Sequence, residues 1–101
     1  MYLIQLLLPE ARNNGQPIDE NTYRGIQEEL SERFGGLTAY RRSPAEGIWR
    51  NEKGQTKDDV FIVEVMVDDL DRAWWEQFRR GLEESLDQKE LVIRAQRIEK
   101  L

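Results

Sequence analysis

The sequence predicts an α+β sandwich in which two helices cover one face of a four-stranded antiparallel sheet. Two apolar runs, Met1–Leu8 and Val60–Val67, each contain a single polar residue, which is typical of central strands with both faces at least partly covered. A segment with helical periodicity follows each run, and two further strand-like segments complete the pattern. The resulting order of strand, helix, strand, strand, helix, strand is the signature of the ferredoxin-like βαββαβ fold.

The first helix is predicted to begin at Asp19 and to stop at Gly35-Gly36. Asp19 suits an N-cap because its carboxylate can accept a backbone N–H of the first turn. The two glycines favour the left-handed conformation that often ends a helix. The apolar face of this helix consists of residues spaced three and four apart: Tyr23, Ile26, Leu30 and Phe34.

The least regular stretch lies between the two apolar runs. Leu37–Arg42 is predicted to be a strand, Ser43-Pro44 an interruption and Gly47–Arg50 its continuation. Proline within a strand is confined to sheet edges and bulges, so we expect this strand at an edge of the sheet. The polar residues Asn51–Asp59 are predicted to form a hairpin loop.

The second helix is predicted to follow the second apolar run. Asp71 suits its N-cap, and the residues of its apolar face are Trp75, Phe78, Leu82 and Leu86. After a short turn, Leu91–Ile98 is expected to form the last strand. It carries Arg94, and charge on a strand is typical of a sheet edge. The two apolar runs would then be the central strands.

Length and charge limit the classes of function. We expect the 101 residues to form one domain, residues 1–101. The formal net charge of −5 favours solubility and disfavours nucleic-acid and anionic-membrane partners. No segment approaches the roughly 20 apolar residues of a membrane helix, so no membrane partner is expected.

The chain contains no cysteine and no histidine. This composition excludes thiol catalysis, histidine general bases and zinc sites built on thiolate or imidazole. It also fits a protein of the reducing cytoplasm. The aspartates Asp68, Asp69 and Asp71 lack the spacing of a calcium loop and are explained by helix capping. We therefore expect no metal and no cofactor.

One face of the predicted sheet lacks a helical cover. Gln5 and Glu64 mark this face, which would expose the apolar residues Leu3, Leu7, Ile62 and Met66. Contiguous apolar surface of this kind usually marks an interface or a ligand cleft. The sequence therefore predicts a homodimer that pairs through the open sheet face.

Glu64 is the sharpest catalytic candidate. A carboxylate within an apolar strand suits a general acid or base, and Gln5 and Arg94 could lie beside it if the strand register allows. The alternative is that Glu64 makes a structural hydrogen bond or ion pair on a partly solvent-exposed face. RNA binding is disfavoured because the central strand VFIVEVMV lacks the aromatic, glycine-containing motif of RNA-binding domains with this topology.

A second candidate site combines arginines with aromatic residues. From Arg41 to Lys57 five basic residues accompany two acidic ones, an excess of positive charge in an acidic protein. Arginine forks and aromatic faces suit an anionic or planar ligand. The candidate ligand-binding residues are Tyr40, Arg42, Trp49, Glu64 and Arg94. The alternative is an ordinary charged edge hairpin in which Trp49 packs into the core or the dimer interface.

The segments RFGGLT, residues 33–38, and SPAEGIWR, residues 43–50, resemble a group of short bacterial conserved hypothetical proteins of unknown function. The layout is also similar to that of the dimeric α+β barrel superfamily, which includes small cofactor-independent monooxygenases. This resemblance implies a dimer with a cavity between each sheet and its helices or partner. Several of those enzymes use a histidine, which this chain lacks, so no catalytic residue is transferred.

Two classes of function remain open from the sequence. The first is a self-associating binding domain for a small, for example anionic, molecule or for a protein partner. The second is a small cofactor-independent enzyme with Glu64 as its acid or base. An enclosed cavity that contains Glu64 and a second polar group would favour the enzyme.

Overall fold

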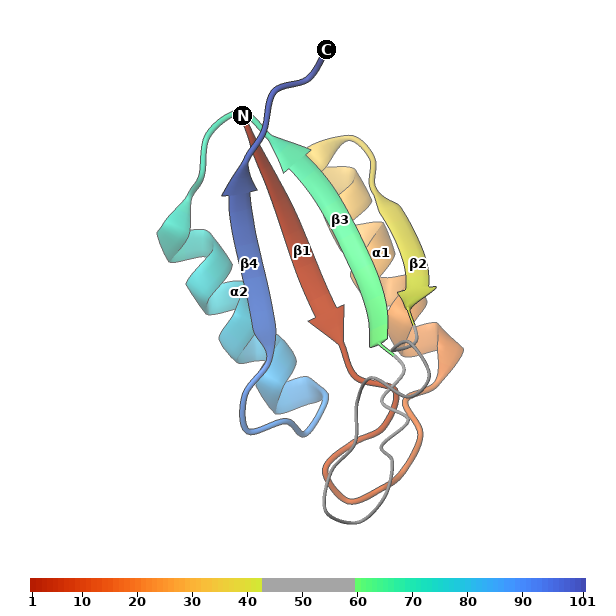
Figure 1. Cartoon of the computed structure of the whole chain (residues 1–101). Helices are drawn as coiled ribbons and strands as arrows, with labels where there is room; N and C mark the ends of the chain where they lie inside the picture. Colours follow the sequence, from red (N-terminus) through yellow and green to blue (C-terminus); the bar gives the residue numbers. More distant parts are fainter. Residues whose placement is uncertain (43–59) are drawn as a thin grey trace, which may run out of the picture.

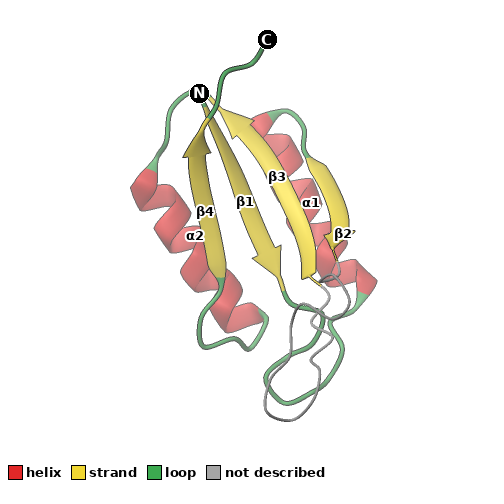
Figure 2. Cartoon of the chain, viewed as in Figure 1, coloured by secondary structure: helices red, strands yellow, loops and turns green. Residues whose placement is uncertain are grey.

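The computed structural model describes residues 1–42 and 60–101, and it confirms the predicted α+β sandwich (Figure 1). The elements are β1 (Tyr2–Leu8), α1 (Glu20–Phe34), β2 (Thr38–Arg42), β3 (Val60–Val67), α2 (Arg72–Ser85) and β4 (Val92–Arg97). The strands form one sheet in the order β2-β3-β1-β4, and every neighbouring pair is antiparallel. Both helices lie on one side of this sheet (Figure 2). The predicted interruption at Ser43-Pro44, the continuation at Gly47–Arg50 and the loop at Asn51–Asp59 lie outside the described residues.

The ends of the helices are those expected from the sequence. The carboxylate of Asp19 accepts hydrogen bonds from the backbone N–H of Thr22 at 2.8 Å and from its hydroxyl at 2.6 Å. Asp71 accepts the backbone N–H of Trp74 at 3.1 Å. Gly35 ends α1 with a φ of 80°, a conformation that glycine adopts without the steric penalty of a Cβ. In the described parts of the chain, neither helix is long and apolar enough to cross a membrane.

The hydrophobic core lies between the helices and the sheet. Alternate residues of the two central strands form one side of the core, and the predicted apolar faces of the helices form the other. Its strand and helix members include Ile4, Leu6, Leu8, Val63, Val65, Val67, Tyr23, Ile26, Leu30, Trp75 and Leu82. Side chains that recur every second residue on the strands therefore pack against side chains that recur every three or four residues on the helices.

The adjacent tryptophans belong to this packing. Trp75 is buried, while Trp74 is half-buried and stacks on Phe78 with ring centroids 4.9 Å apart. The guanidinium of Arg33 lies 4.1 Å from the Trp74 ring centroid, in cation–π geometry. Phe34 stacks on Trp75 at 5.2 Å. These contacts fasten the end of α1 to the start of α2.

Three hydrogen bonds, together called the latch, join the loop after β1 to the end of α2 and the turn that follows it. Arg12 donates from Nη1 to the Ser85 carbonyl at 2.6 Å, and the backbone N–H of Asn13 donates to the Asp87 carbonyl at 3.0 Å. Gln88 donates from Nε2 to the Ala11 carbonyl at 2.9 Å. The latch thus ties together two connections that belong to different halves of the fold.

The open face differs from its prediction at one position. Leu3 and Leu7 are half-buried and Met66 is 51% exposed, but Ile62 is only 1% exposed, so its expected exposure was wrong. Ile62 pairs in register with Tyr40 on β2 and with Leu7 on β1. A side chain on a central strand has a neighbour on each side, and alternation along one strand does not reveal them.

Candidate functional site

A row of polar residues crosses the open sheet face. Gln5 on β1 pairs in register with Glu64 on β3 and with Arg94 on β4, and Glu64 also pairs with Thr38 on β2. Side chains at directly paired positions share one face of the sheet. The strand register therefore brings Gln5, Glu64 and Arg94 side by side.

Three hydrogen bonds connect this row. Gln5 donates from Nε2 to Glu64 Oε2 at 2.6 Å, and the Tyr40 hydroxyl donates to the same oxygen at 3.0 Å. Arg94 donates from Nε to Gln5 Oε1 at 2.8 Å. The Gln5 amide is thereby oriented, because its NH₂ group faces a carboxylate and its oxygen faces a guanidinium.

The row keeps two opposite charges apart. Within the described residues, neither the Glu64 carboxylate nor the Arg94 guanidinium has an ion-pair partner, and Gln5 lies between them. Arg94 is exposed and Glu64 is half-buried. The open face therefore presents a negative group on β3 and a positive group on β4, one strand to either side of β1.

Apolar side chains border the row on both sides. Towards one end of the strands lie Leu3 and Met66, and towards the other lie Tyr40, Leu7 and Val92. Val92 is 45% exposed and Tyr40 is 39% exposed. The face combines a short polar centre with exposed apolar flanks, a composition that suits association with another surface.

The structure brings together three of the five candidate ligand-binding residues: Tyr40, Glu64 and Arg94. Trp49 and the side chain of Arg42 lie outside the described residues, so the proposed arginine–aromatic site remains a prediction. Gln5 was expected only as a neighbour of Glu64, yet it is the centre of the row. The single polar residue in the first apolar run was its signal.

The carboxylate of Glu64 is engaged within the polar row. Its carboxylate accepts two hydrogen bonds, and it lines none of the three cavities formed by described residues at the margins of the sheet. These cavities have volumes of about 580, 620 and 510 Å³. Across residues 1–42 and 60–101, no group of three acidic side chains is arranged to hold a metal ion.

The fold is shared with a protein of known structure. A phage SAM lyase solved in complex with S-methyl-5′-thioadenosine superposes on this chain with a TM-score of 0.53 and 14% sequence identity. The match covers 94% of this chain and 79% of that chain. No protein-family model and no curated protein matches the sequence. At this level of identity the likeness establishes a common α+β architecture.

Proposed function

We propose that the protein is a self-associating, small-molecule-binding domain whose copies pair through the open sheet face. The observation that carries this proposal is the separation of charge about Gln5. Glu64 and Arg94 lie one strand to either side of it, about 4.8 Å away in each direction, without an ion-pair partner among the described residues. A surface with this arrangement is complementary to itself.

Charge complementarity selects one of two face-to-face dimers. A two-fold axis that runs parallel to β1 through Gln5 sets Glu64 of each copy opposite Arg94 of the other. An axis perpendicular to the strands would instead set Glu64 against Glu64 and Arg94 against Arg94. Because like charges across an interface cost several kcal/mol, we propose the axis parallel to β1.

The flanks of the row support pairing through this face. With the axis along β1, strand β3 of one copy crosses β4 of the other, so Met66 and Val92 become covered by the partner sheet. Packed sheets lie about 10 Å apart, a distance that the long side chains of Glu64 and Arg94 can span. The similarly folded phage protein was solved with a small molecule bound, which supports a small ligand as the cargo of this domain.

Light scattering on single and mixed charge-reversal variants tests this pairing. We expect the wild type to be a dimer, and Glu64→Arg and Arg94→Glu each to weaken self-association at least tenfold, because each creates two like-charge contacts. A 1:1 mixture of the two variants should form a heterodimer, because every contact is then between opposite charges. Arg24→Glu, on the exposed side of α1, is the control and should leave the mass unchanged.

Each other outcome contradicts a defined part of the proposal. A wild-type protein that is monomeric contradicts the proposal that copies associate through this face. A Glu64→Arg variant that remains as dimeric as the wild type contradicts the axis parallel to β1. With the perpendicular axis, residue 64 faces residue 64 of the partner, so the substitution would replace a contact between two glutamates with a contact between two arginines. Circular dichroism on each variant separates loss of pairing from loss of folding.

A further inference from the structure

The outer edge of β4 is accessible to another strand. The sheet order places β4 at one edge, with β1 as its neighbour, and five of its six residues are exposed. Sheets usually protect an edge with a bulge, a proline or a covering segment. The register of β4 with β1 runs one-to-one from Arg97 to Val92, and its sequence, VIRAQR, contains no proline. The strand therefore presents a regular edge that is guarded by the charges of Arg94 and Arg97.

Alternation along β4 determines which of its backbone groups point outward. The N–H of Ile98 donates to the Met1 carbonyl at 3.1 Å, so every second residue before Ile98 also turns its backbone towards β1. The N–H of Leu91 points the other way and donates to Glu83 Oε2 on α2 at 2.9 Å. Three residues of β4 share the outward orientation of Leu91: Ile93, Ala95 and Arg97. Each turns one N–H and one C=O away from β1, as the next strand of an antiparallel sheet requires.

A cavity lies beside the start of this edge, on the side of α2. This edge cavity has a volume of about 510 Å³, and Leu91, Val92 and Ile93 supply its apolar surface. Glu83 stands in its wall and is held by two hydrogen bonds, from Arg79 Nη1 at 2.8 Å and from the N–H of Leu91. A strand added to β4 would set one of its side chains beside Ile93, over this apolar surface. The edge cavity therefore has room for an apolar side chain of the added strand.

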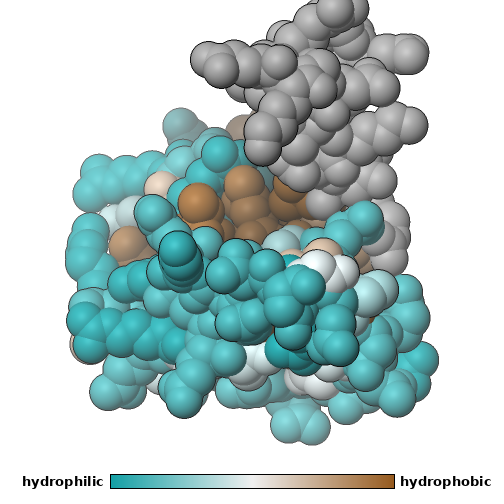
Figure 3. Space-filling view, turned by 90° about the horizontal axis from the view of Figure 1, so that it is seen from below, coloured by the Kyte–Doolittle hydropathy of each residue, from teal (hydrophilic) through white to brown (hydrophobic). Residues whose placement is uncertain are grey.

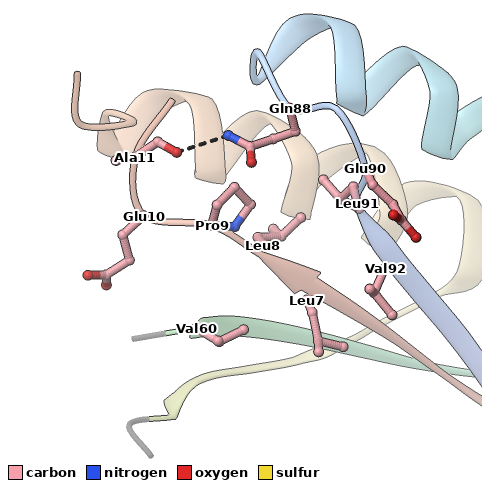
Figure 4. A pocket seen from close by; sticks show the side chains of 10 residues that line it. All are labelled: Leu7, Leu8, Pro9, Glu10, Ala11, Val60, Gln88, Glu90, Leu91 and Val92. Carbon is pink, nitrogen blue, oxygen red and sulfur yellow. Dashed lines mark hydrogen bonds between the residues drawn. The ribbon is translucent and has the colours of Figure 1, made fainter. Parts of the chain in front are cut away.

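The start of β4 also borders a second cavity. This cavity, of about 580 Å³, opens at the end of the sheet where β1 leaves it and β3 and β4 enter. Seen from that end, the molecule shows an apolar hollow bordered by hydrophilic side chains (Figure 3). Figure 4 shows the turn before β4, where Gln88 donates to the Ala11 carbonyl, and the side chains of Leu91 and Val92 that follow it. Leu91 and Val92 line both cavities, so the start of β4 separates them, and a strand added at the edge would reach only the edge cavity.

From these features we infer that the outer edge of β4 binds an extended peptide segment of another protein, as an added antiparallel strand. The segment pairs its backbone with Ile93, Ala95 and Arg97. Its side chains opposite Ile93 and Ala95 are apolar, because they face the edge cavity and a small, exposed alanine. Its side chain opposite Arg94 is acidic, because Arg94 is exposed on the open face and opposite charges at paired positions attract.

Charge distinguishes this occupant from a second copy of the chain. β4 carries no acidic residue, so a second β4 would have none to place opposite Arg94. The edge lies in the plane of the sheet, so the proposed pairing through the open face leaves it accessible. The five N–H donors of a guanidinium also allow Arg94 to contact both the segment and Glu64 of a second copy. The inference thus goes beyond the proposed function and does not depend on it.

Amide hydrogen exchange measured by NMR tests the strand addition. The probe is the synthetic peptide Thr-Thr-Val-Glu-Leu-Thr-Thr with blocked ends, whose Val, Glu and Leu can lie opposite Ala95, Arg94 and Ile93. At saturation we expect exchange of the outward amides of Ile93, Ala95 and Arg97 to slow about tenfold. The amides of Arg94 and Gln96 already point to β1 and should change little. The same peptide N-methylated at Val and Leu cannot donate to β4 and is the control. Equal binding of this control, or protection that does not alternate along β4, would overturn the inference.

A comparison of two peptides tests the contact with Arg94. The parent peptide should bind about threefold more tightly than the same peptide with Gln in place of Glu, at pH 7 and low ionic strength. This difference should disappear in Arg94→Gln and persist in Arg24→Gln, a change on the exposed side of α1. A change in pairing between copies affects both peptides equally and cancels in this comparison. No difference in the wild type, or a difference that survives in Arg94→Gln, contradicts the acidic class of segment.

Ala95→Pro keeps this inference separate from the proposed function. It removes an outward N–H and no bond to β1, so the fold should persist, and the peptide should bind about tenfold more weakly. Circular dichroism verifies folding, and the N-methylated peptide gives the same test if the variant does not fold. A folded variant that stays dimeric in light scattering and loses the peptide agrees with both proposals. Loss of the dimer in this variant would show that the edge joins two copies, which overturns both. A monomeric wild type that binds the peptide overturns self-association alone, and a dimeric wild type that does not bind it overturns this inference alone.

Discussion

The two faces of β1 show how one strand can serve two purposes. Leu6 and Leu7 are neighbours in sequence, but Leu6 is fully buried beneath the helices and Leu7 is half-buried on the open face. Apolar packing alone accounts for the covered face. The open face instead carries three hydrogen bonds and two separated charges around Gln5, in the middle of otherwise apolar surface. The difference indicates that the covered face forms the hydrophobic core, and it is the open face on which we place the proposed pairing.

The largest effect should come from the same truncation on the two faces. Leu6→Ala should lower the free energy of unfolding by about 3 kcal/mol, because it leaves a cavity in a layer that cannot collapse. Leu7→Ala should cost about 1 kcal/mol or less in the monomer, because its side chain is already half in water. Urea unfolding, at protein concentrations below the dissociation constant of the proposed dimer, measures the loss for both variants. Equal losses would show that the two faces are packed alike.

A smaller effect should follow from a near-isosteric change within the polar row. Gln5→Glu sets a second carboxylate where an amide now donates to Glu64 at 2.6 Å, and like charges at paired positions repel. We expect a net loss of about 1 kcal/mol at pH 7, because the charge pair that the new carboxylate forms with Arg94 offsets only part of the repulsion. Gln96→Glu, an exposed change on β4, is the control and should cost much less. A loss no larger than that of Gln96→Glu would contradict this account.

The smallest effect concerns charges in the helical layer. Hydrogen bonds from the hydroxyl and backbone N–H of Thr22 lower the pKa of Asp19 below its ordinary 3.8. The backbone N–H of Leu91, followed by Arg79, lowers the pKa of Glu83 below its ordinary 4.5. A carboxyl group whose folded pKa is lowered contributes stability above its unfolded pKa, and loses it as pH falls through the folded value.

We therefore expect thermal stability to fall as the pH is lowered through 4.5 and 3.8 and below. Asp19→Asn and Glu83→Gln should lower the melting temperature at pH 7 and flatten its decline in acid. Glu84→Gln, next to Glu83 in the sequence, serves as the control. Melting curves recorded from pH 7 to about pH 3 measure this, and variant curves parallel to the wild type would contradict it.

The order of elements could be predicted because local signals agree with the fold. Two apolar runs with one polar residue each become the central strands, and Asp19, Asp71 and Gly35 cap the helices as expected. Period and capping are properties of neighbouring residues, so one sequence suffices to find them. Strand register is not local, and only the structure brings Gln5 between Glu64 and Arg94.

The remaining features depend on contacts across the sheet. Alternation along β3 assigned Ile62 to the open face correctly, but it could not reveal the flanking strands beside which Ile62 is buried. Thr38 gave no signal in the sequence and still belongs to the polar row. The cavity at the sheet end could not be predicted, because its lining comes from the end of β1, the start of β3 and the turn before β4.

The latch between the two connections has a consequence for how the molecule opens. Its hydrogen bonds join residues 73 and 77 positions apart, so they form only when both halves of the chain have docked. The amide proton of Asn13, which donates to Asp87, should therefore exchange with solvent through cooperative opening of the whole domain, although it lies in a surface loop. The exchange rate of this one proton therefore reports how strongly the two halves are held together, as the exchange rate of an amide in the central strands would.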